Sequence, residues 1–175
     1  QEVVEGKVDL TKLPIMRYTE KDGGKYIASA VSIIKDPEFG TQNMCFHRLM
    51  LLDKNRFVAR IVENRGTDTA LKKAGGELDI AICIGNSTAV LLSAATTMPM
   101  GVDELGMANA LEETALVKCK TVDLKVPKDC EIVLEGRITK STPAGFVDTR
   151  SNFAFSDSIS LAAPRIPVLG DMVTE

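Results

Sequence analysis

Residues 41–66 constrain the fold more than any other stretch of the chain. Two apolar runs rich in strand-forming residues, Met44–Leu52 and Phe57–Val62, flank the polar residues 53–56. Two such runs around a short polar turn predict a β-hairpin, in which Asn55 can adopt the left-handed turn conformation. The chain is therefore expected to build its sheet around this hairpin.

Polar side chains occur among the apolar residues of the hairpin. If the strands are buried, each of these side chains needs a hydrogen-bond or ion-pair partner. They are the amide, imidazole and guanidinium groups of Asn43, His47, Arg48, Arg60 and Arg65. Because guanidinium groups bind phosphate and carboxylate as bidentate forks, this set indicates a pocket for an anion. Strand alternation would place Asn43 and Arg48 on opposite faces, so a shared pocket requires the strand to bulge or end between them.

The rest of the chain predicts a mainly β protein with inserted helices. Strands are expected at 26–34, 78–85, 116–124 and 131–138, and helices at 67–73, 88–96 and 103–112. The strands follow one another as in hairpins and no regular β-α-β alternation is present, which favours an antiparallel barrel or curled sheet.

Composition limits the function classes. A net charge of −3, 5% aromatic residues and no tryptophan argue against nucleic-acid binding. No apolar stretch is long enough to span a membrane. The four cysteines form no Cys-x-x-Cys pair and the single histidine cannot complete a zinc site, so we expect reduced thiols and a cytoplasmic protein.

Two acidic residues outside the hairpin could complete a site. A carboxylate such as Glu104 can ligate a divalent cation together with an amide, and an acid such as Asp148 could carry a proton. Simpler roles stay open at this point. Glu104 could only stabilise the helix dipole, Arg60 and Arg65 could be solvated cations, and His47 could be a core histidine.

Six segments in chain order resemble the UbiD family, whose members are decarboxylases that depend on prenylated FMN. They are Glu5–Pro14, Asp22–Ile27, Asn43–Arg48, Gly101–Leu111, Val117–Pro127 and Glu131–Gly136. The sequence of these segments is most similar to the branch that acts on 4-hydroxybenzoate-type acids. The resemblance implies a split antiparallel β-barrel, related to flavin reductases, over residues 1–140. Residues 141–175 would be a divergent tail that carries Asp148.

The resemblance also implies roles for individual residues. Asn43 and Glu104 would ligate Mn²⁺, which bridges to the flavin phosphate, and a monovalent cation such as K⁺ could accompany it. Arg48 would face the substrate carboxylate, and Asp148 would protonate the carbon that loses carbon dioxide. The residues expected to contact the flavin are Phe46, His47, Arg48, Arg60, Ile61, Val62, Arg65 and Gly66.

The implied function is a carboxy-lyase acting on an aromatic or α,β-unsaturated carboxylic acid. A flavin prenyltransferase would supply the cofactor, and the chain would be a homo-oligomer or a subunit of a larger decarboxylase. Pro143 stands where the family usually has a glutamate, no histidine follows Arg65, and family members are more than twice as long. These departures motivate two alternatives: a catalytically silent flavin-binding or assembly module, and a flavin reductase-like protein using unmodified FMN.

Overall fold

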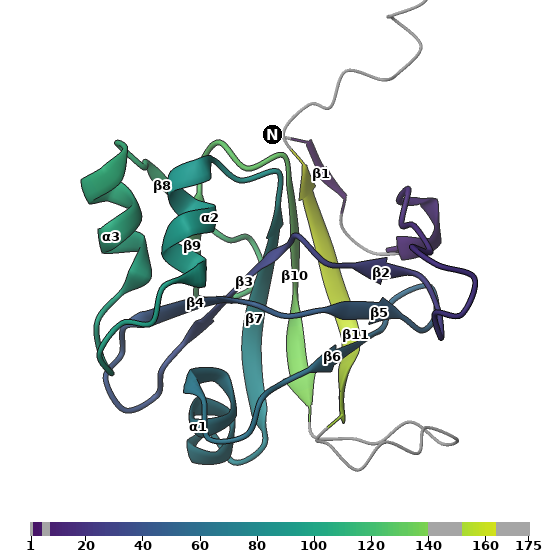
Figure 1. The fold of residues 1–175 in the computed structure, drawn as a ribbon, viewed down its shortest axis with the longest axis horizontal. Coiled ribbons are helices and arrows are strands. Elements are labelled where there is room, and N and C mark those ends of the chain that lie inside the picture. The colour runs from purple at the N-terminus through teal and green to yellow at the C-terminus, as the bar shows by residue number, and fades with distance from the viewer. Residues whose placement is uncertain (1, 5–7, 140–151, 164–175) are drawn as a thin grey trace, which may run out of the picture.

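The structure is a computed structural model that describes residues 2–4, 8–139 and 152–163. One large antiparallel sheet dominates it (Figure 1). In spatial order its strands are β2 (Tyr26–Ile27), β5 (Leu49–Leu51), β6 (Phe57–Arg60), β11 (Asn152–Ala163), β10 (Ile132–Thr139), β7 (Glu77–Ile84), β3 (Val31–Lys35) and β4 (Gln42–Phe46), and β1 (Glu2–Val4) pairs with β11.

The sheet curls because β4 and β5 lie near its opposite ends. Only His47 and Arg48 connect them, so the ends must approach each other at this point (Figure 1). No backbone ladder joins β4 to β5 among the described residues, and the sheet there is not closed into a barrel. The expectation of a mainly β protein with inserted helices is confirmed, whereas the split-barrel assignment stays a prediction.

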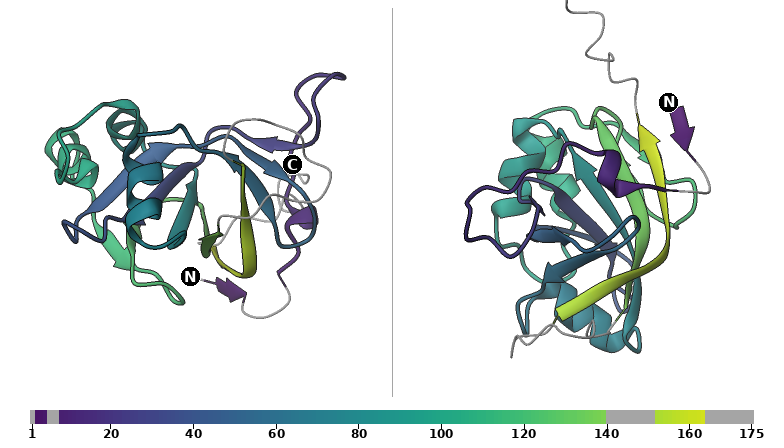
Figure 2. Two further views of the ribbon diagram at one scale, coloured as in Figure 1. Left: turned by 90° about the horizontal axis from the view of Figure 1, so that it is seen from below. Right: turned by 90° about the vertical axis from the view of Figure 1, so that its right-hand side faces the viewer.

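Three α-helices accompany the sheet: α1 (Gly66–Lys73), α2 (Thr88–Ala95) and α3 (Glu104–Leu111), while Leu10–Lys12 form a 3₁₀ turn. The helices α2 and α3 pack against each other and against β4, and the two orientations in Figure 2 show them on one side of the sheet. Their first turns are capped by the side chains of Ser87 and Asp103, which accept hydrogen bonds from backbone N–H groups.

Apolar side chains cover both faces of the central strands. In β7, Ile80 and Ile82 belong to a core cluster inside the curl, whereas Ala81 and Cys83 belong to a second cluster beneath α2 and α3. This alternation explains the continuous apolar run in β7, since a strand buried on both faces needs no polar side. Among the described residues, no helix is long and apolar enough to cross a membrane.

A small hairpin of β8 (Leu116–Lys118) and β9 (Lys125–Pro127) is held by a buried carboxylate. Glu135 of β10 is fully buried, and its oxygens accept hydrogen bonds from the backbone N–H groups of Lys120 (2.9 Å) and Thr121 (2.6 Å). These bonds satisfy a charge that would otherwise be costly to bury.

The structure differs from the expected elements in two strands and in the predicted tail. The strand at 26–34 is divided into β2 and β3, and the strand at 116–124 ends at Lys118. Within the predicted tail, Asn152–Ala163 forms β11, which pairs with β10 and β6 in the large sheet. The domain boundary at residue 140 stays a prediction.

Candidate functional site

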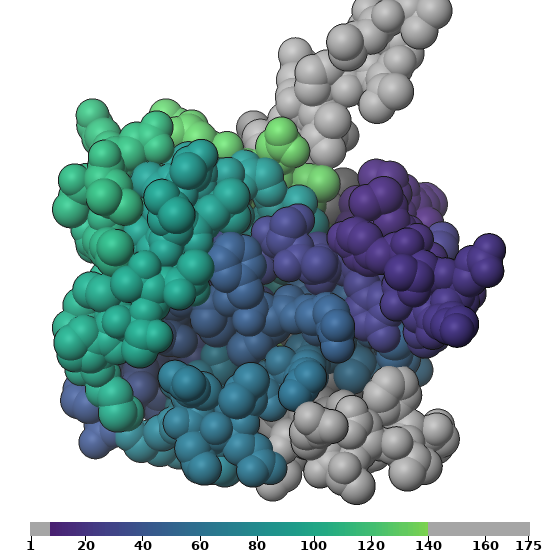
Figure 3. Space-filling view, viewed as in Figure 1, coloured from purple at the N-terminus to yellow at the C-terminus, as the bar shows by residue number. Residues whose placement is uncertain are grey.

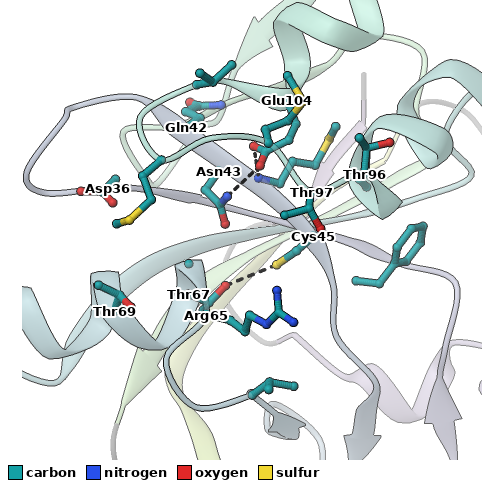
Figure 4. A pocket seen from close by; sticks show the side chains of 18 of the residues that line it. Asp36, Gln42, Asn43, Cys45, Arg65, Thr67, Thr69, Thr96, Thr97 and Glu104 are labelled. Atoms are coloured by element: carbon teal, nitrogen blue, oxygen red, sulfur yellow. Dashed lines mark hydrogen bonds between the residues drawn. The ribbon is translucent and has the colours of Figure 1, made fainter.

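A cavity of about 410 Å³ lies where β4 approaches the first turn of α1 and the segment that joins α2 to α3 (Figure 4). The polypeptide brings together nine of the predicted site residues around it: Asn43, Phe46, His47, Arg60, Ile61, Val62, Arg65, Gly66 and Glu104. Both ends of the hairpin and the start of α3 therefore line the cavity.

Asn43 and Glu104 meet on one wall of the cavity. Glu104 Oε1 accepts a hydrogen bond from Asn43 Nδ2 (2.9 Å), and Glu104 Oε2 accepts one from the Met44 backbone N–H (3.0 Å). The Glu104 side chain is buried, and this burial raises the pKa of its carboxyl group. A positive charge beside this carboxylate would offset the cost of burying it.

The first turn of α1 faces the same wall. Arg65 is the residue before the helix, and its side chain makes no capping hydrogen bond to this turn. A Cβ atom on Gly66 would lie only 3.0 Å from Asn43 Oδ1, so glycine permits the helix to approach the amide. Free N–H groups at a helix N-terminus attract anions such as phosphate.

Two cations border this position. Arg60 and Arg65 are exposed at the cavity, and neither forms an ion pair with a carboxylate within the part of the chain that the structure describes. By contrast, Asp68 in the first turn of α1 pairs with Lys72 at 2.6 Å. The cavity thus presents unpaired positive charge beside a helix N-terminus.

A buried polar cluster links β4 to α1. His47 Nε2 lies 3.0 Å from Thr67 Oγ1 and 3.2 Å from Cys45 Sγ, and Cys45 Sγ lies 3.3 Å from Thr67 Oγ1. Burial lowers the pKa of His47 to about 4, against a hydrogen bond to the Arg60 backbone, and burial raises the pKa of Cys45 to about 11. Both groups are therefore neutral near pH 7.

Sequence reasoning missed Cys45 and Thr67. Strand alternation was the signal for Cys45, because Asn43, Cys45 and His47 fall on one face of β4 and its extension. For Thr67 the sequence indicates only the start of a helix.

Arg48 is placed differently from the other arginines. The strand does end between Asn43 and Arg48, since β4 stops at Phe46 and β5 begins at Leu49. The Arg48 side chain is exposed and does not line the cavity, and its guanidinium carbon lies 5.5 Å from the centre of the Tyr26 ring. Asp148, the predicted acid, lies outside the described residues.

The cavity suits an oxygen-ligated cation only if further ligands come from elsewhere. No group of three or more His, Cys, Asp and Glu side chains that could hold a metal ion occurs in residues 8–139. Asn43 and Glu104 supply an amide and a carboxylate oxygen, which suit a hard cation such as Mn²⁺. The first turn of α1 lies beside them, so an anion bound there would supply a further oxygen ligand.

The sequence matches the UbiD family, described as the 3-octaprenyl-4-hydroxybenzoate carboxy-lyase Rift-related domain, over residues 1–152. It is 40% identical to anhydromevalonate phosphate decarboxylase from Methanothermobacter thermautotrophicus over 156 residues, which is 85% of this chain and 36% of that protein. The chain thus spans about a third of the length of this relative.

Solved structures share the fold. The UbiD-class enzyme HmfF from Pelotomaculum thermopropionicum in complex with FMN has 32% sequence identity and a TM-score of 0.82, over 93% of this chain and 40% of that one. An evolved dimeric form of HmfF in complex with prFMN matches with a TM-score of 0.81. An FMN-binding domain of a flavin reductase-like enzyme from Shewanella baltica has a TM-score of 0.50 at 14% identity, over 78% of this chain and 69% of that one, and is similar in fold alone.

The curled antiparallel sheet is thus of a class that includes flavin-binding domains. Within that class, the chain belongs to the UbiD family of decarboxylases.

Proposed function

We propose that this chain forms the prenylated-FMN site of a carboxy-lyase that acts on an α,β-unsaturated or aromatic carboxylic acid. The observation that carries the proposal is the convergence of Asn43, Glu104 and the uncapped start of α1 at one cavity wall. A flavin monophosphate needs such an anion site, and Asn43 and Glu104 would hold a divalent cation beside it.

Different residues of the cavity would then contact different parts of the cofactor. The phosphate would lie at Gly66 and Arg65, with Mn²⁺ on Asn43 and Glu104. The ring system would lie against Phe46, His47, Ile61 and Val62, with Arg60 at its edge. Bound there, the cofactor supplies an electron sink for the carbon that loses carbon dioxide.

Arg48 and Asp148 are the proposed catalytic residues. Arg48 would bind the substrate carboxylate as a bidentate fork, and Asp148 would deliver a proton to the substrate carbon after carbon dioxide leaves. The protein thereby contributes orientation, a fixed positive field and one proton.

The 40% identity to anhydromevalonate phosphate decarboxylase supports an unsaturated acid that itself carries a phosphate. The short link between β4 and β5 supports a split-barrel arrangement like that of flavin reductases. A flavin prenyltransferase would supply the cofactor, with K⁺ as an accompanying cation. The chain would act as a homo-oligomer or as part of a larger decarboxylase.

Release of carbon dioxide tests the function. The protein is loaded anaerobically with prenylated FMN and Mn²⁺. Anhydromevalonate phosphate or 4-hydroxybenzoate is then added as substrate. We expect release from one of them, and its loss in Asp148→Asn and Arg48→Ala. Cofactor retention without carbon dioxide release would favour the silent module. Oxidation of a nicotinamide with unmodified FMN would favour the flavin reductase-like alternative.

A further inference from the structure

The contact between Arg48 and Tyr26 follows from strand register. Tyr26 of β2 lies opposite Met50 of β5, and Ile27 lies opposite Leu49. Side chains two residues apart in an extended segment share a face, so Arg48 projects on the same side as Met50 and diagonally across from Tyr26. Its guanidinium carbon lies 5.5 Å from the centre of the Tyr26 ring, within the range of a cation–π contact.

The strand that carries Tyr26 is fixed to its neighbours. The Tyr26 N–H donates a hydrogen bond to the Met16 carbonyl (2.9 Å), and its side chain is half-buried. A Cβ atom on Gly24 would lie 3.1 Å from Met50 Sδ, so the loop before β2 packs closely on the neighbouring strand. In Figure 3 this N-terminal segment (purple) borders the blue strand region at the side away from α2 and α3 (green).

The guanidinium of Arg48 is available to an anion. It is exposed, and no carboxylate in the part of the chain that the structure describes forms an ion pair with it. An aromatic ring packs against the flat face of a guanidinium and leaves the N–H groups at its edge free to donate to a carboxylate.

The backbone of Arg48 adjoins the cavity, although its side chain is not among the lining residues. The two residues before it, Phe46 and His47, line the cavity, and so does Arg60. The Arg60 backbone N–H donates a hydrogen bond to the Arg48 carbonyl (3.4 Å), which fixes the connection between β4 and β5. The backbone of Arg48 is therefore tied to the cavity wall while its side chain rests on Tyr26.

We propose that Tyr26 is a positioning residue for carboxylate recognition. Its ring holds the Arg48 guanidinium next to the β4–β5 connection that borders the cavity, with the N–H edge free for the carboxylate of the acid substrate. This inference rests on the proposed function, in which Arg48 binds that carboxylate. It adds a residue from a separate strand, β2, to the binding of the substrate.

The test follows the arginine Nε–H groups by ¹⁵N-edited NMR, with Arg48→Lys identifying the Arg48 signal. The ligands are 3-methylbut-2-enoate and, as an uncharged control, its amide. The variants Tyr26→Leu and Tyr26→Val remove the ring, Tyr26→Phe keeps it, and Tyr18→Leu changes another exposed tyrosine. Thermal unfolding selects the ring-deletion variant that folds, and flavin retention is measured on the same samples.

The Arg48 signal should show an upfield ring-current shift in the wild type and in Tyr26→Phe, and lose it when the ring is removed. The acid, but not the amide, should move this signal. Ring removal should weaken acid binding about two- to fivefold, as expected for an exposed cation–π contact, whereas Tyr26→Phe and Tyr18→Leu should leave it unchanged.

Unchanged acid affinity after ring removal would overturn the inference, and so would a wild-type Arg48 signal that the acid does not move. Loss of flavin from a wild-type protein that still responds to the acid would instead count against the proposed function alone.

Discussion

Asn43 Nδ2 donates a hydrogen bond of 2.9 Å to Glu104 Oε1 across a sequence separation of 61 residues. This bond fixes the first turn of α3 against β4 and directs an amide and a carboxylate to one cavity wall (Figure 4). The Met44 N–H holds the second oxygen of Glu104 at 3.0 Å, so the carboxylate cannot turn without losing a buried hydrogen bond.

Replacing Glu104 with glutamine tests the proposed cation site. The amide has the same size but no negative charge, so Mn²⁺ affinity should fall at least about 10–100-fold, which is the loss typical of mutating a residue that only supports a metal ligand. Calorimetric titration of Mn²⁺ in the presence of flavin measures this. Glu112→Gln at the exposed end of α3 is the matched control. Equal Mn²⁺ affinity in the Glu104→Gln and control variants would exclude Glu104 as a ligand.

Gly66→Ala tests the close approach between α1 and the amide. The added Cβ would lie 3.0 Å from Asn43 Oδ1, so the amide must move away from the first turn of α1. We expect weaker FMN binding, measured by quenching of flavin fluorescence. Gly106→Ala in α3 meets nothing within 4 Å and should leave binding unchanged while stabilising its helix by about 0.5–1 kcal/mol. Wild-type flavin affinity in Gly66→Ala would contradict this account of the wall.

Lowering the pH should destabilise the protein through His47, its single histidine. Burial lowers the folded-state pKa to about 4 from the ordinary value of 6.5. Between these values the unfolded chain binds the extra proton, so stability should fall as the pH decreases through this window, by about 1.4 kcal/mol per pH unit at most.

Urea unfolding at about pH 7.5 and about pH 5 measures this effect, in the wild type and in His47→Gln. The wild type should lose about 2 kcal/mol more than the variant between these conditions, since the variant has no imidazole to protonate. Identical losses would show that His47 titrates normally in the folded state.

Much of the fold was predictable because strong local signals agree with the tertiary structure. The apolar run of β7 and the acidic start of α3 both lie where the sequence placed them. The strand β11 was missed, although Phe153, Phe155, Ile159 and Leu161 alternate with small or polar residues. Proline and glycine residues on either side of this segment favour an irregular tail, and that signal competes with the alternation.

The sequence indicates which residue types gather at the site, but not which neighbour each side chain contacts. Asn43 and Glu104 meet at one wall of the cavity, and their role as metal ligands stays a prediction. The placement of Arg48 depends on the register between β2 and β5. No local pattern specifies which ring a long exposed side chain will contact. The partners of His47 were hidden for the same reason, because Thr67 comes from a different element.

Anaerobic reconstitution with prenylated FMN and Mn²⁺, followed by desalting and a visible absorption spectrum, tests the central claim most directly. The wild type should retain the flavin, and Asn43→Ala and Glu104→Ala should each lose it while remaining folded. A wild-type protein that releases all flavin on desalting, or variants that retain it fully, would contradict the claim that this cavity holds the cofactor.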